Sequence, residues 1–178
     1  MERHQQLEKL LVGRMRAIRA KQQYVDLLQL FYTYFEGLEQ KIKPFINEFN
    51  FPDYGKRRKA GLLEADICSF GVTANAVAAS EDLPGINNEY DAYGALYVIE
   101  GSTLGGKIIS AMMAKHLNLA DGTGVSFFTG YGEDTENMWQ EFKQTLNRLT
   151  AGKQKDDLII EAANQTFSKF KLWIEKMG

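Results

Sequence analysis

The chain has 178 residues, 44% of them hydrophobic and 25% charged, which is the composition of one compact domain and excludes a largely disordered chain. Its 21 Lys and Arg residues balance 23 Asp and Glu residues, so the domain as a whole has no electrostatic basis for binding nucleic acid or an anionic membrane. A single cysteine, Cys68, excludes internal disulfides and thiolate metal clusters, and no apolar run approaches the roughly 20 residues of a membrane span, so we expect one cytoplasmic domain over residues 1–178.

The first helices follow from the spacing of apolar residues. These residues recur every three or four positions over residues 2–42, which is typical of amphipathic helices. Gly13 and the basic cluster after it interrupt the apolar stripe, so the pattern predicts two helices joined near Ala20. Pro44 ends the second of them.

The rest of the chain is also predicted to be helical. The remaining elements are a connection over 45–55, a third helix over 56–79, a bent fourth helix over 89–119, a Gly-rich irregular loop over 121–133, a helix from Asp134 or Thr135 to Thr150, and an amphipathic helix after Gly152. The inner side of the last helix is predicted to contain Ile159, Ala163, Thr166, Phe167, Phe170, Ile174 and Met177. The fold class is all-α, in one domain without internal repeats.

Three glycines lie inside the predicted fourth helix, at Gly101, Gly105 and Gly106. The run from Gly101 to Lys107 approaches the phosphate-binding pattern G-x-x-x-x-G-K-[ST], but Ile108 occupies the hydroxyl position, which disfavours a phosphate loop. A glycine inside a helix costs about 0.5 to 1 kcal/mol relative to alanine, and the close approach of another group is the usual compensation. That group is either a large flat ligand or a neighbouring helix, and the spacing alone does not separate the two.

The first helix carries a second candidate site. His4 and Glu8 stand four positions apart on the face that also contains Leu7 and Leu11, so the carboxylate is placed to accept a ring N–H of the histidine. A neutral imidazole held in this way is suited to binding a metal. The alternative is a surface histidine near a terminus. The other histidine, His116, is interpreted as a packing or capping residue at the end of the long helix.

Three segments carry a family resemblance: residues 4–8 (HQQLE), residues 32–35 (YTYF) and the long run 96–106 (LYVIEGSTLGG). Together they resemble the heme oxygenase family, in particular its bacterial, biliverdin-forming branch. The order and spacing of the predicted helices agree with that family over nearly the whole chain. The resemblance implies a single-domain helical bundle that holds heme between an N-terminal proximal helix and a kinked distal helix.

The resemblance also implies roles for individual residues. His4 would be the axial ligand of the heme iron, and Glu8 would orient its imidazole ring. The distal face of the porphyrin would be covered by Gly101, Ser102, Gly105 and Gly106. Of these residues, we expect His4, Gly101, Ser102 and Gly105 to take part in catalysis.

Two further positions relate to proton delivery and to the heme propionates. Many members of the family carry an aspartate that organises proton-delivering waters where this chain has Ser102, so ordered water alone is expected to serve here. The sequence around Phe142 and Lys143 resembles the family segment that supplies a cation to the propionates, which makes Lys143 the candidate and Arg148 the second choice. The family also places a second cation ahead of the histidine, at a position that this chain does not possess because it starts only three residues before His4, so either propionate binding differs or the natural N-terminus is longer.

The function implied is oxidative cleavage of heme to biliverdin, carbon monoxide and ferrous iron. Heme would be both substrate and cofactor, dioxygen the second substrate, and the electrons would come from an external donor such as a ferredoxin or another reductase, because no flavin or nicotinamide motif is present. Two other classes stay open: a non-catalytic heme- or bilin-binding protein of the same fold, and a purely structural helical module.

Two basic stretches allow two interpretations. Residues 56–59 (KRRK) and the stretch over residues 14–21 are either solvated helix faces or a docking surface for an acidic electron donor.

Overall fold

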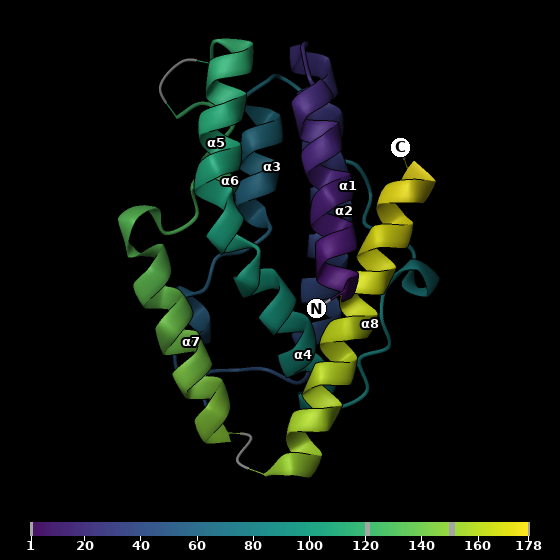
Figure 1. Ribbon diagram of the computed structural model, residues 1–178, viewed down its shortest axis with the longest axis vertical. Helices are drawn as coiled ribbons and strands as arrows, with labels where there is room; N and C mark the ends of the chain where they lie inside the picture. The colour runs from purple at the N-terminus through teal and green to yellow at the C-terminus, as the bar shows by residue number, and fades with distance from the viewer. Residues whose placement is uncertain (1, 120–121, 150–151, 178) are drawn as a thin grey trace.

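The structure is a computed structural model that describes residues 2–119, 122–149 and 152–177, with the backbone alone at positions 2–4 and 153. Eight α-helices and three short 3-10 helices follow one another in the described ranges, and no strand occurs in them (Figure 1). The α-helices are α1 (Glu2–Ala17), α2 (Lys21–Ile42), α3 (Gly61–Cys68), α4 (Glu89–Gly101), α5 (Thr103–Leu117), α6 (Ser126–Thr129), α7 (Thr135–Leu149) and α8 (Lys153–Met177). The 3-10 helices are η1 (Tyr54–Lys56), η2 (Ser80–Asp82) and η3 (Gly132–Asp134). The prediction of an all-α single domain is confirmed.

Helix α2 is the centre of the core. Most of its residues are buried, because other helices pack around it on several sides. Its buried polar groups are satisfied by distant parts of the chain: the Tyr34 hydroxyl donates to the Thr166 carbonyl at 3.0 Å, and the Leu30 carbonyl accepts from Trp173 Nε1 at 3.1 Å. Phe31 packs against Phe170 with ring centroids 5.2 Å apart. These contacts fix α8 along α2.

Helices α4 and α8 pack closely where a glycine permits it. A Cβ atom on Gly94 would lie 2.6 Å from the Ala162 side chain and 2.6 Å from the Ile159 carbonyl oxygen, so only glycine allows this approach. The prediction for the inner face of α8 is confirmed at its fully buried positions, but Met177 is 54% exposed, because the buried stripe ends at Trp173 and Ile174.

The third helix is shorter than predicted. Of residues 56–79, only α3 is α-helical, and Gly71 takes a positive φ of 73° soon after the helix ends. The chain then runs along α2, where the Gln29 amide donates to the Thr73 carbonyl and accepts from the Asn75 N–H, both at 2.8 Å. Ala78 donates to the Thr33 carbonyl at 2.9 Å. Hydrogen bonds to α2 therefore replace the helical bonds that the alanine-rich sequence predicts.

Glu39 connects α2 to the start of α3, and its ionisation is expected to make stability depend on pH. Burial raises the pKa of Glu39 to about 7, although its Oε1 accepts the Ala60 N–H at 2.8 Å, which opposes the rise. Because this pKa lies above its value in the unfolded chain, the free energy of unfolding falls as pH rises from about 4.5 to about 7.

Glu39→Gln retains the acceptor for Ala60 and removes the charge. We expect the variant to gain about 2 kcal/mol over the wild type between pH 5 and pH 8, measured by urea unfolding at both values. Glu161→Gln, at an exposed position on α8, controls for the loss of one negative charge. A constant difference between wild type and Glu39→Gln across this pH range would show that Glu39 is ionised normally.

Candidate functional site

The predicted bend in the long helix is present. α4 ends at Gly101, α5 begins at Thr103, and Ser102 lies between them, where the ribbon changes direction (Figure 1). The residues before Gly101 are helical, whereas a phosphate loop follows a β-strand. The phosphate-loop interpretation of the run up to Lys107 is therefore wrong.

The three glycines near this break have different surroundings. A Cβ atom on Gly106 would lie 2.0 Å from the Phe128 carbonyl oxygen, so α6 itself requires glycine there. A Cβ atom on Gly101 would lie 3.7 Å from the Trp139 ring, an ordinary contact, and one on Gly105 would have no heavy atom within 4 Å. Close packing against α6 thus accounts for Gly106, whereas the role of this residue in heme binding stays a prediction. Of the three, Gly105 faces open space.

The face of α5 that contains Gly105 is apolar and uncovered. Leu104 is 44% exposed and Ile108, one turn later, is 70% exposed. Together with the open side of Gly105, these two side chains form a small apolar surface of the kind that a ligand or a partner covers. This face provides an exposed apolar surface beside the break.

Helix α1 carries the candidate ligand in its first turn. The backbone places His4 and Glu8 one turn apart on the same helix, as predicted, while the His4 side chain lies outside the described residues. Leu7 is 5% exposed, so this turn of α1 is anchored in the core, and Glu8 is exposed. The Gln6 side chain accepts a hydrogen bond of 3.4 Å from Lys171 on α8. The relation between the imidazole and the Glu8 carboxylate stays a prediction.

A buried ionic cluster lies on the other side of the break. Arg57 is 2% exposed, and its guanidinium donates to the Glu100 carboxylate at 3.1 Å and to the Met138 carbonyl at 2.7 Å. It also forms an ion pair with Asp53. Arg57 therefore joins the chain before η1 to both α4 and α7.

Tyr131 connects the two arginines of this cluster. Its hydroxyl lies 3.0 and 3.1 Å from the two oxygens of the Glu100 carboxylate and accepts the Arg58 backbone N–H at 2.6 Å. Burial raises the pKa of Glu100, and the positive charge of Arg57 opposes this rise. Burial likewise raises the pKa of Tyr131.

Arg58 contacts the break directly. Its side chain donates to the Ile99 carbonyl at 2.9 Å, to Ser102 Oγ at 2.5 Å and to the Phe127 carbonyl at 3.1 Å. Ser102 Oγ in turn donates to the Ile99 carbonyl at 2.7 Å. Burial lowers the pKa of Arg58 to about 10, an effect that the charge of Glu100 opposes, so the guanidinium is charged at neutral pH.

The short helix α6 is fixed from three sides. The buried Asp66 carboxylate of α3 accepts the backbone N–H groups of Ser126 and Phe127 at 3.0 and 2.9 Å, which caps the start of α6. Arg58 binds the Phe127 carbonyl, and Gly106 lies against the Phe128 carbonyl. These contacts hold α5 at a set distance from α3.

Sequence reasoning missed this cluster. It interpreted residues 56–59 as solvated or as a docking surface, and both interpretations are wrong for Arg57 and Arg58, which are buried. Glu100 was an available signal, since an acidic residue within an apolar run such as YVIEG needs a buried cationic partner. Nothing in the spacing identifies that partner, because it lies 43 residues away.

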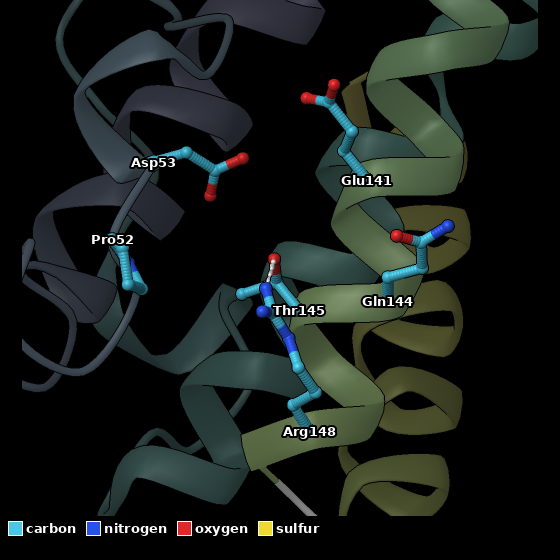
Figure 2. Close-up of a pocket in the computed structure, with 6 residues that line it drawn as sticks. All are labelled: Pro52, Asp53, Glu141, Gln144, Thr145 and Arg148. Carbon is cyan, nitrogen blue, oxygen red and sulfur yellow. Dashed lines mark hydrogen bonds between the residues drawn. The ribbon is translucent and has the colours of Figure 1, made fainter.

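The two candidates for propionate binding lie on α7 but differ in their surroundings. Lys143 is half-buried, with Nζ 5.6 Å from the centroid of the Trp139 ring that borders Gly101. Arg148 is exposed and donates to Thr145 Oγ1 at 3.1 Å (Figure 2). Arg148 lines a pocket of about 220 Å³ together with Pro52, Asp53, Glu141, Gln144 and Thr145. The two carboxylates of this pocket disfavour an anion, so Lys143 is the better placed cation.

Two further kinds of feature concern the described residues: clusters of metal-binding side chains and helices that could span a bilayer. No group of three or more His, Cys, Asp and Glu side chains able to hold a metal ion is found among them. Within the same ranges no helix is both long and apolar enough to cross a bilayer.

Comparison with known proteins identifies the family. The sequence profile described as "Heme oxygenase" matches residues 1–176. A heme oxygenase from Xanthomonas campestris pv. campestris (strain 8004) is 28% identical over 141 residues, which are 78% of this chain and 81% of that protein. The solved structure of heme oxygenase from Leptospira interrogans has the same fold, with a TM-score of 0.75 and 21% identity, and the match covers 98% of this chain and 94% of that one. The profile matches nearly the whole chain, and the solved structure shares its fold. The protein belongs to the heme oxygenase family.

Proposed function

We propose that this protein is a heme oxygenase that cleaves heme to biliverdin, carbon monoxide and ferrous iron. The observation that carries the proposal is the uncovered apolar face of α5 at Leu104, Gly105 and Ile108, which begins next to the break. A porphyrin is a flat apolar ligand that such a face suits. The family supplies the reaction, and α1 supplies the one histidine near the start of the chain.

The residues that would hold heme come from two helices. His4 on α1 would bind the heme iron, with Glu8 as the acceptor that orients its ring. Gly101 and Gly105 would lie under the opposite face of the porphyrin, and Lys143 would bind a propionate. Heme, when bound, supplies both the iron that activates dioxygen and the ring that is cleaved.

Ser102 and Gly106 have narrower roles in this proposal. The Ser102 hydroxyl already donates to the Ile99 carbonyl and accepts from Arg58, so ordered water would carry protons to the site and the hydroxyl would not donate to a bound ligand. Gly106 would act indirectly, because it sets the distance between α5 and α6. An external donor such as a ferredoxin would supply the electrons.

A non-catalytic heme- or bilin-binding protein is the second candidate. The engaged Ser102 hydroxyl favours it, because no carboxylate stands at that position to organise water. Both candidates predict histidine-ligated heme, and only the enzyme predicts that the ring is opened.

The test is a heme titration followed by one aerobic reduction. We expect wild-type protein to bind heme with a histidine-ligated absorption spectrum, and reductant with air to convert this spectrum to that of a bilin. His4→Ala is expected to weaken heme binding by about tenfold or more and to abolish bilin formation.

The matched control is His116→Ala, which removes the other histidine at an exposed position in the last turn of α5. It should behave as wild type. A stable spectrum through aerobic reduction would favour the binding protein, and equal heme spectra in wild type and His4→Ala would refute His4 as the ligand.

A further inference from the structure

We propose that Arg58 is a positioning residue of this site, which fixes the break between α4 and α5 and holds the Ser102 hydroxyl turned away from the face of α5. The claim that Arg58 affects the heme site rests on the proposed function. The claim that Arg58 fixes the break concerns the protein without heme and stands apart from that function.

Arg58 joins three separate parts of the fold. The carbonyl of Ile99 belongs to α4, Ser102 is the break itself, and the Phe127 carbonyl belongs to α6. A guanidinium presents its N–H groups in a rigid plane, so binding three acceptors at once sets their mutual positions. A lysine ammonium has no such planar fork.

The hydrogen bonds also favour the end of α4 at this point. The Ile99 carbonyl accepts from both Arg58 at 2.9 Å and Ser102 Oγ at 2.7 Å. Side-chain donors on a helical carbonyl compete with the backbone N–H that would continue the helix, which bends or ends it. Arg58 and Ser102 thus act together on one carbonyl.

The environment makes this contact hard to replace by water. Arg58 is 4% exposed, and its guanidinium carbon lies 3.8 Å from the centroid of the Phe127 ring. Its Nε has no hydrogen-bond partner, and no carboxylate of the described residues forms an ion pair with it. The negative charge of Glu100 acts on the guanidinium at a distance, while Tyr131 joins the Glu100 carboxylate to the Arg58 backbone N–H. The buried Arg58 guanidinium therefore contacts the break where water has little access to replace it.

Amide hydrogen exchange of the heme-free protein tests the structural part. Arg58→Met should raise exchange of the amides at positions 102–106 by about tenfold or more, because the break loses the guanidinium that joins Ser102 to the Phe127 carbonyl of α6. Arg58→Lys should give an intermediate rate, as a partial rescue. Exchange in Arg58→Lys that equals wild type would overturn the proposal, and this variant decides the matter if Arg58→Met does not fold.

Two comparisons separate positioning from general destabilisation. Ser126→Ala removes another polar contact of α6, the one to Asp66, without touching the break, and should leave exchange at 102–106 unchanged. In the double variant Ser102→Ala/Arg58→Met, the amides at 102–106 should exchange more slowly than the sum of the two single effects on the exchange free energy predicts, because both substitutions remove the same contact. Strict additivity would overturn the coupling.

The heme-loaded protein supplies a spectroscopic readout. At equal heme occupancy, Arg58→Met should shift the absorption maximum of the complex, whereas Ser126→Ala should not. An unshifted maximum in Arg58→Met would overturn the link to the site. If the wild type binds no heme, the proposed function fails, and the exchange result still decides whether Arg58 fixes the break.

Discussion

Gly106→Ala is expected to lower the free energy of unfolding by about 2 to 3 kcal/mol, although alanine is the better helix former. The added Cβ would lie 2.0 Å from the Phe128 carbonyl oxygen, and a backbone atom cannot rotate away as a side chain can. The carbonyl is also held in place, because Asp66 caps α6 and Arg58 binds the neighbouring Phe127 carbonyl. Relief would require α5 and α6 to move apart.

Gly105→Ala is the matched control, one residue earlier on the same helix. Its Cβ would have no heavy atom within 4 Å, so this variant should be as stable as wild type or up to about 1 kcal/mol more stable. The order should be reversed for heme affinity: Gly105→Ala should weaken heme binding more than Gly106→Ala does, because the proposed porphyrin surface lies at Gly105. Urea unfolding and heme titration of both variants check this, and equal stabilities of the two would refute the packing explanation for Gly106.

The helices that the sequence predicts well are those whose packing face repeats along the chain. α1, α2, the bent pair α4 and α5, α7 and α8 all follow the apolar spacing within a few residues. The prediction over 56–79 is too long because alanine spacing reports helical tendency only, whereas Gln29 and Thr33 of α2 offer the chain other hydrogen bonds. Contacts with residues about 45 positions away cannot be inferred from local spacing.

The sequence predicts the bent helix and its glycines, but it does not predict the buried contacts that hold the bend in place. A glycine required by a ligand and a glycine required by a backbone carbonyl look the same in sequence, which is why Gly105 and Gly106 are told apart only by their surroundings. Arg57 and Arg58 resemble a solvated basic stretch for a similar reason. Their burial depends on Glu100, Tyr131 and the α6 carbonyls, none of which is a sequence neighbour.

Arg57→Met is expected to cost about 3 to 5 kcal/mol at neutral pH, the largest loss of stability that we predict for a single substitution outside the apolar core. The methionine fills much of the same volume but leaves the buried Glu100 carboxylate without its ion pair and the Met138 carbonyl without its donor. Lys56→Met, at the exposed position just before it, should change stability by no more than about 0.5 kcal/mol.

The pH dependence of this loss identifies its cause. Burial already raises the pKa of Glu100 against the opposing charge of Arg57, so removing that charge raises the pKa further. A carboxyl group whose pKa is raised on folding destabilises the protein fully above that pKa, and this effect declines as the pH falls from that pKa towards the pKa of the unfolded chain. Urea unfolding at pH 7.5 and pH 5 should therefore show a smaller loss for Arg57→Met at pH 5.

A second substitution separates the unpaired charge from the lost packing. Glu100→Gln in the Arg57→Met background removes the charge and leaves an amide oxygen that can accept from the Tyr131 hydroxyl, so it should recover part of the loss at pH 7.5 and little at pH 5. A loss that is the same at both pH values, with no recovery in the double variant, would mean that Arg57 stabilises the fold by filling space between α4 and α7. The buried charge of Glu100 would then be tolerated through Tyr131 and the charge of Arg58.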